Sequence, residues 1–223
     1  MLNKNVLALK LMTFLLSVLP AIQLFYHFKT NQLGINGLET LIHITGLSAL
    51  VLYIITLAIT PFRRSFSYVM ILLKMTYGKR LGDWNWMIRL RRMLGVFCFL
   101  YATLHFLIFF YFELDFEINE LFLEVRDRPF ILAGMLALVL LFPLFLTSTN
   151  YSMKILKRNW RIIHHLMYPI GFIISLHYLW LSKAGVYDAY PYVLIIVLLI
   201  LFRIFDHYKI IFTREDDGME VRR

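Results

Sequence analysis

One stretch decides the fold: residues 89–115 read RLRRMLGVFCFLYATLHFLIFFYFELD. No charged side chain lies between Arg92 and Glu113. A helix needs about 20 mostly apolar residues to cross the hydrocarbon core of a bilayer, and this run has that length. It does not alternate polar with apolar side chains, as a strand of a membrane barrel would. The stretch therefore predicts a transmembrane helix, with His105 inside it.

The same pattern recurs along the whole chain. We expect six membrane helices, at about 8–28, 41–61, 93–112, 130–148, 162–182 and 189–205. The chain has 223 residues, of which 60% are hydrophobic and 17% charged, whereas soluble domains are about half apolar and a quarter charged. The spans leave no room for a large soluble domain. The sequence thus predicts an all-α fold in which residues 1–223 form a single polytopic membrane domain, a six-helix bundle.

Composition also excludes several classes of protein. So apolar a chain is neither disordered nor a soluble nucleic-acid-binding protein, despite its net charge of +9. The single cysteine, Cys98, excludes a disulfide framework and a cysteine metal cluster.

The net charge instead indicates the orientation of the chain in the membrane. The loops after the second and fourth spans are rich in Lys and Arg, whereas the loop after the third span holds mostly Asp and Glu. The positive-inside rule places basic loops in the cytoplasm. We therefore expect both termini and the basic loops inside and the acidic loop outside. The short apolar run at 65–73, within the first basic loop, is either an interfacial segment or an ordinary surface loop.

Histidines are the candidate functional residues, because ionisable groups inside a membrane are costly. His105 lies roughly 18 Å along its helix from the expected cytoplasmic end, and His177 lies roughly 20 Å beyond His164 at 1.5 Å per residue. His105 and His177 should therefore both lie in the outer half of the membrane. Two imidazoles at one depth on different helices suit the axial ligands of one haem iron.

The other histidines have several interpretations. His164 should lie in the inner half, and an ideal helix would turn it about 140° away from His177 unless Pro169 changes the phase. His43 lies near the outer end of its span and is either a neighbour of the haem or a packing residue. His165 is expected on the surface, and His27 and His207 at the membrane interfaces. For any single histidine, hydrogen-bonded packing is the competing interpretation.

Four blocks of sequence are similar to a known family. They are LIHITGLSALVLYIITLAITPFRR (41–64), residues 89–115 as quoted above, RPFILAGMLALVLLFPLFLTSTN (128–150) and NWRIIHHLMYPIGFIISLHYLW (159–180). Together they resemble the MsrQ family, the haem-binding membrane subunits of bacterial methionine-sulfoxide reductase systems, within the ferric-reductase-like transmembrane family. In that wider family two haems are held by paired histidines. The resemblance implies ligand roles for His105, His164 and His177, but arginines stand where the first histidine of the third span is expected, at Arg91 or Arg92. Residues 65–85 look like an insertion.

The resemblance also implies a function. A member would reside in the bacterial inner membrane and carry haem b, one or two per chain, and FMN. It would pass electrons from quinol or a cytoplasmic flavin reductase to a periplasmic molybdenum-dependent partner, MsrP, which reduces methionine sulfoxide. The sequence shows no site for that reduction in this chain, so we expect an electron-transfer subunit. It also shows no flavin motif, so FMN rests on the resemblance.

Three alternatives remain at this stage. The chain would serve a metal or oxygen reductase if a partner supplied the flavin and nucleotide domain. A proton-coupled transporter would use the histidines as a relay and bind no coloured cofactor. A scaffold subunit without cofactor is a third reading.

Overall fold

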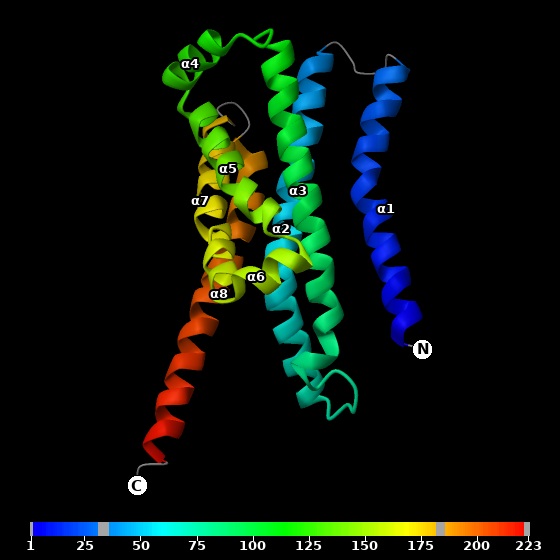
Figure 1. The fold of residues 1–223 in the computed structure, drawn as a ribbon, viewed down its shortest axis with the longest axis vertical. Helices are drawn as coiled ribbons and strands as arrows, with labels where there is room; N and C mark the ends of the chain where they lie inside the picture. Colours follow the sequence, from blue (N-terminus) through cyan, green and yellow to red (C-terminus); the bar gives the residue numbers. More distant parts are fainter. Residues whose placement is uncertain (1, 31–35, 182–185, 221–223) are drawn as a thin grey trace.

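The fold is helical, and the residues that the structure describes, given in the next sentence, contain no strand (Figure 1). The computed structural model describes residues 2–30, 36–181 and 186–220, with side chains for 6–30, 36–80, 82–181 and 189–206. The helices are α1 (Leu2–Lys29), α2 (Gly37–Leu72), η1 (Leu81–Trp84), α3 (Asn85–Phe112), α4 (Ile118–Asp127), α5 (Pro129–Leu146), α6 (Asn150–His164), α7 (Met167–Leu181) and α8 (Val186–Glu220). The predicted all-α class is confirmed.

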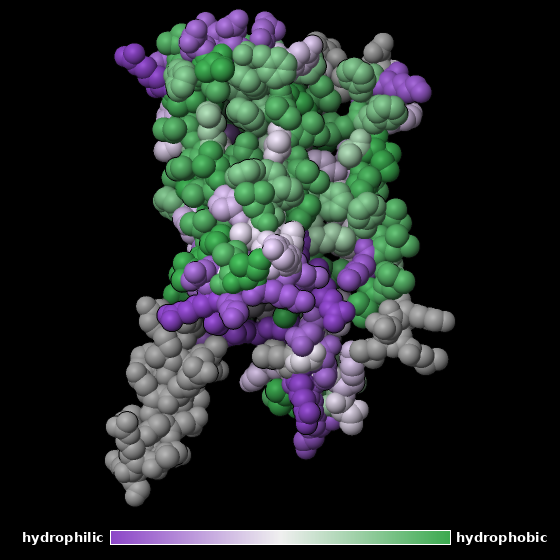
Figure 2. Space-filling view, viewed as in Figure 1, coloured by the Kyte–Doolittle hydropathy of each residue, from purple (hydrophilic) through white to green (hydrophobic). Residues whose placement is uncertain are grey.

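An apolar belt surrounds the bundle. In Figure 2 hydrophobic residues cover its middle, and hydrophilic residues gather at both ends. Within the described residues, six segments are long and apolar enough to cross a membrane, from Val6–Lys29 to Ala189–Asp206. The chain is therefore a multi-pass membrane protein. We call the end with the α2–α3 and α5–α6 connections the basic end, and the end with α4 the acidic end. The beginning of α1 and the end of α8 both lie at the basic end (Figure 1).

The core lies between α2, α3, α7 and α8. Leu57 of α2, Ile170 of α7 and Ile196 of α8 are almost fully buried there. Helix α1 stands at the edge of the bundle, packed against α2 and α3, and most of its apolar side chains are exposed. Exposed apolar side chains on a membrane helix face lipid at no cost, so this arrangement is stable in a bilayer.

Helix α2 is longer than the span expected at 41–61. It continues through Pro61 to Leu72. Proline within a helix removes the hydrogen bond to the carbonyl four residues earlier, here that of Leu57. Arg203 of α8 supplies the missing donor, because its Nη2 lies 2.8 Å from the Leu57 carbonyl oxygen. The guanidinium of Arg203 therefore satisfies a backbone carbonyl of a neighbouring helix.

The segment after this helix is an ordered connection to α3. Ser67 donates a hydrogen bond to the Lys79 carbonyl, and the Trp84 indole donates one to the Gly78 carbonyl, at 2.8 and 2.9 Å. Gly78 has a φ of +87°, a conformation that side chains disfavour. The run at 65–73, for which the sequence left two interpretations, forms the last part of α2 and its C-cap residue, Leu73.

The expected fifth span is broken in two. Helix α6 ends at His164 and α7 begins at Met167, so a turn separates His164 from His177. Pro169 lies in the first turn of α7, where its missing N–H costs nothing. The angle of about 140° between the two histidines, expected for one continuous helix, therefore does not apply. Ser182, the last residue of the expected span, lies outside the described residues.

Candidate functional site

Two histidines face each other between two pairs of helices. His105 comes from α3 and His177 from α7, and their ring centroids are 6.3 Å apart with the planes at 89°. Helix α3 packs on α2, and α7 packs on α5. Both imidazoles are partly buried. The structure thus brings together the two histidines that the sequence placed at one depth.

Each imidazole is tied to a backbone carbonyl of the helix beside it. The Nδ1 of His105 lies 2.9 Å from the Ile42 carbonyl oxygen, and the Nδ1 of His177 lies 2.6 Å from that of Phe130. A carbonyl oxygen only accepts hydrogen bonds, so the proton of each neutral ring is on Nδ1. The lone pair of each Nε2 is then free for a metal. Metal-binding histidines in proteins are commonly oriented in this way.

Each ring also lies against a glycine. A Cβ added to Gly46 of α2 would stand 3.0 Å from the ring of His105, and one added to Gly134 of α5 would stand 2.8 Å from that of His177. Atoms this close repel, so a side chain at either position would displace the imidazole. Each glycine follows by four residues the carbonyl that its histidine contacts. The same arrangement therefore occurs on both sides of the site.

The spacing fits one metal ion between two axial imidazoles. Histidine nitrogens bind metals at about 2 Å and lie about 1 Å from the ring centre, which gives centroids roughly 6 Å apart. The observed 6.3 Å agrees. Within the described ranges no group of three or more His, Cys, Asp or Glu residues could hold a metal ion. Two histidines suffice only where the metal's other ligands come from a cofactor, as in haem.

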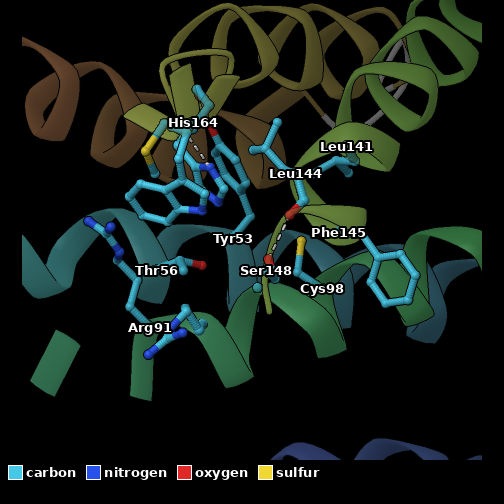
Figure 3. Close-up of a pocket in the computed structure, with 13 residues that line it drawn as sticks. Tyr53, Thr56, Arg91, Cys98, Leu141, Leu144, Phe145, Ser148 and His164 are labelled. Atoms are coloured by element: carbon cyan, nitrogen blue, oxygen red, sulfur yellow. Dashed lines mark hydrogen bonds between the residues drawn. The ribbon is translucent and has the colours of Figure 1, made fainter. Parts of the chain in front are cut away.

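His164 lies in a separate pocket near the basic end, which we call the His164 pocket (Figure 3). The indole of Trp160 stacks on its ring, with centroids 4.0 Å apart. The Trp160 Nε1 donates a hydrogen bond to the Thr147 carbonyl at 2.9 Å, which fixes the indole. The Nδ1 of His164 lies 3.1 Å from the Trp160 carbonyl oxygen, so its Nε2 is the free nitrogen.

The His164 pocket is positively charged and has no second histidine in its lining. Arg91 and Arg92 of α3 line it. Figure 3 shows Arg91 reaching in from the helix across the pocket from His164. A guanidinium is always protonated and cannot bind a metal. No acidic side chain is among the described lining residues, which are Tyr53, Thr56, Arg91, Arg92, Gly95, Cys98, Leu141, Leu144, Phe145, Ser148, Trp160, His164 and Met167. The two arginines make the pocket suitable for an anionic group.

The remaining histidines lie elsewhere. His43 is exposed on the surface of α2, and His165 is exposed in the turn between α6 and α7. His27, near the end of α1, has a buried Nδ1 without a hydrogen-bond partner among the described residues. The side chain of His207 lies outside the described residues. The described ring contacts of the facing pair include none of His27, His43 and His165.

Sequence reasoning missed the groups that hold the imidazoles in place. Gly46, Gly134 and Trp160 were not singled out, and backbone carbonyls carry no sequence signal. A glycine inside a predicted membrane helix does indicate close approach of another group. Gly46 and Gly134 were therefore detectable as contact positions, although not as neighbours of particular histidines.

The sequence of this chain is similar to those of known proteins. A family model described as "Ferric reductase like transmembrane component" matches residues 45–175, which include His105 and His164 and end two residues before His177. A protein of Herminiimonas arsenicoxydans is 41% identical over 88% of this chain and 84% of its own length. Proteins of Ralstonia nicotianae and Azospira oryzae are 38% and 30% identical, over 83% and 91% of this chain and 78% and 81% of their own lengths.

All three relatives carry the name "Protein-methionine-sulfoxide reductase heme-binding subunit MsrQ". The similarity extends over most of both partners in each comparison, so it is not confined to one motif. The chain therefore belongs to the ferric reductase like transmembrane family and, within it, to the MsrQ family.

Proposed function

We propose that the chain is a haem b electron-transfer subunit of a protein-methionine-sulfoxide reductase system. The observation that carries this proposal is the facing pair of imidazoles, 6.3 Å apart, each with Nδ1 tied to a carbonyl. The relatives' printed name, a heme-binding subunit, supports the same cofactor.

His105 and His177 would hold the iron through their Nε2 atoms. When bound, haem supplies one-electron transfer at a potential set by its axial ligands, burial and hydrogen bonding. The carbonyls of Ile42 and Phe130 keep each imidazole in one tautomer and one orientation. The apolar helices around the pair exclude water, and Gly46 and Gly134 leave room for the rings.

The electrons would cross the membrane from the basic end to the acidic end. The charge asymmetry of the loops supports a basic end on the cytoplasmic side, by the positive-inside rule. The donor would be quinol of the bacterial inner membrane or a cytoplasmic flavin reductase. The acceptor would be the periplasmic molybdopterin subunit MsrP, where methionine sulfoxide in oxidised proteins is reduced. Donor, acceptor and membrane follow from the family.

The axial ligands are tested by substitution. His105→Ala and His177→Ala should each abolish the low-spin Soret band of the purified protein, because each removes one of two axial ligands. His43→Ala and His165→Ala are the matched controls, since both histidines are exposed. Spectra and haem content per chain, from a pyridine haemochrome assay, are measured for all four variants. A normal low-spin spectrum in both His105→Ala and His177→Ala would reject the pair.

The His164 pocket is the candidate for further cofactor binding. One haem per chain is expected from the facing pair, because no second histidine lines the pocket among the described residues. A haem ratio of two that falls to one in His164→Ala would assign a second haem there. FMN is expected from the family resemblance, and released flavin is measured by fluorescence of the same preparations.

The colour of the detergent extract separates this function from the alternatives. Electron transfer predicts a red protein whose α and β bands sharpen on reduction with dithionite. A proton-coupled transporter or a scaffold subunit would be colourless. A metal or oxygen reductase would also be red, but its electrons would not require MsrP as acceptor, which reconstitution with the purified partner tests.

A further inference from the structure

A second pocket lies at the basic end, between α1, α3 and the start of α6. We call it the Lys10 crevice. It has a volume of about 650 Å³ and is lined by Lys10, Arg89, Arg92, Met93, Val96, Ser148, Thr149 and Asn150. It is distinct from the facing histidine pair, none of whose residues lines it. Arg92 and Ser148 separate it from the His164 pocket, since they line both.

Positive charge dominates the crevice. Lys10, Arg89 and Arg92 come from two helices, and no carboxylate is among the described lining residues. Arg92 is held in place, because its Nη1 donates a hydrogen bond to the Asn150 side-chain oxygen at 2.5 Å. The ion pairs found in the described part of the chain involve neither Lys10 nor Arg89. Cations brought together without anionic partners repel one another, so an anion that binds all three would stabilise the arrangement.

The surrounding groups favour phosphate. Arg and Lys are the usual ligands of phosphate oxygens, and the hydroxyl groups of Ser148 and Thr149 are further donors on the crevice wall. Met93 and Val96, which follow Arg89 and Arg92 along the same face of α3, add an apolar part to the lining. A phosphate with attached hydrocarbon matches this combination.

The position of the crevice favours a lipid as the source of that phosphate. It lies between α1, α3 and the start of α6, and Figure 2 shows hydrophilic residues gathered beneath the apolar belt at this end of the bundle. Leu7, Leu11 and Leu15 on α1 are largely exposed, so acyl chains have an apolar helix to follow. Basic pockets between membrane helices on the cytoplasmic side are known to suit anionic headgroups. We propose that the Lys10 crevice binds the phosphate headgroup of an anionic membrane lipid and thereby fastens α1 to α3 and α6.

The test compares two variants of equal charge. Lys10→Gln/Arg89→Gln removes two cations that line the crevice. Lys154→Gln/Arg158→Gln removes two exposed cations of α6 that do not line it. Each full-length protein is placed in phosphatidylcholine nanodiscs with increasing phosphatidylglycerol, purified again in detergent, and assayed by native mass spectrometry for retained lipid. Circular dichroism and gel filtration confirm that both variants fold.

The crevice variant should retain phosphatidylglycerol at least roughly tenfold more weakly than the wild type, since each surface cation contributes on the order of 1 kcal/mol to such binding. The control variant should retain it like the wild type. Equal retention by all three proteins, or equal loss in both variants, would overturn the proposal. Displacement of the lipid by millimolar inorganic phosphate would instead identify a free phosphate as occupant and overturn the lipid assignment.

Haem content of the same preparations separates this inference from the proposed function. Lys10 and Arg89 line neither the facing histidine pair nor the His164 pocket, so the crevice variant should keep a normal haem spectrum. If the crevice variant loses lipid and keeps its haem, the result supports lipid binding in the Lys10 crevice independently of the electron-transfer proposal.

Discussion

At the scale of single residues, the site depends on contacts that surround the two imidazoles. Their depth followed from counting residues along helices that enter from the same side. Their orientation depends on the carbonyls of Ile42 and Phe130, which any residue would supply. The sequence therefore predicted which histidines meet and could not predict what holds them.

The glycines under the rings give the sharpest residue-scale prediction. Gly46→Ala and Gly134→Ala each place a methyl group within 3.0 Å of an imidazole. The ring must move away from its carbonyl, and loss of such an orienting contact costs roughly 10- to 100-fold in metal affinity. We expect a matching fall in affinity for haem, measured by titrating haem into apoprotein in detergent.

Gly82→Ala is the control for this experiment. A Cβ at Gly82 would have no other heavy atom within 4 Å, and Gly82 lines neither described pocket. Haem affinity should stay as in the wild type. If Gly46→Ala and Gly134→Ala also bind haem normally, the close approach of glycine and imidazole is irrelevant to the site.

At the scale of helices, α2 and α8 depend on each other through one hydrogen bond. Pro61 leaves the Leu57 carbonyl without its helical donor, and Arg203 of α8 takes that place. Met167 and Tyr168 of α7 lie beside the same guanidinium. A charged side chain in a membrane helix is costly unless it finds such partners. Arg203 therefore joins three helices.

The energetic coupling between Pro61 and Arg203 can be measured by substitution. Arg203→Leu should destabilise the protein by about 1–3 kcal/mol, because a buried carbonyl loses its donor. In a Pro61→Ala background the helix regains its own N–H, so the same substitution should cost less. Thermal unfolding in detergent of the two single variants and the double variant gives the coupling. If the two substitutions change the free energy of unfolding additively, the stabilising effect of Arg203 does not depend on the Leu57 carbonyl.

The break between α6 and α7 shows why helix boundaries were harder to predict than helices. The run 162–182 is apolar enough to be one span, and Pro169 was the only visible signal of a change. The chain turns before that proline, at His165 and Leu166. Apolar composition specifies membrane depth but not where a helix starts, which here depends on packing against α5 and on Trp160.

At the scale of the whole molecule, composition predicted the fold class well. A membrane forces backbone groups to bond within a segment, so apolar length alone indicates helices. The number of membrane segments follows from that rule. The pairing of α2 with α3 and of α5 with α7 does not, because side-chain fit between helices decides it and a single sequence does not reveal that fit.

The orientation across the membrane gives the prediction at this scale. The single cysteine, Cys98, is buried, so an introduced cysteine is the main target for a membrane-impermeant maleimide. Glu120→Cys on α4 should label in intact spheroplasts. Lys154→Cys on α6 should label only after permeabilisation, because basic loops stay in the cytoplasm. The reverse pattern would invert the proposed direction of electron flow.

The two imidazoles belong to helices that emerge far apart in time during synthesis. His105 is carried by α3, and its counterpart by α7, after the acidic-end helix and α5 have been made. On the proposed function, the pair of iron ligands is incomplete until α7, which carries His177, has left the ribosome and entered the bilayer. Haem capture is then a late step of biogenesis. Chains truncated before α7 should insert into the membrane without haem. Membrane proteases should then degrade them faster than the full-length chain.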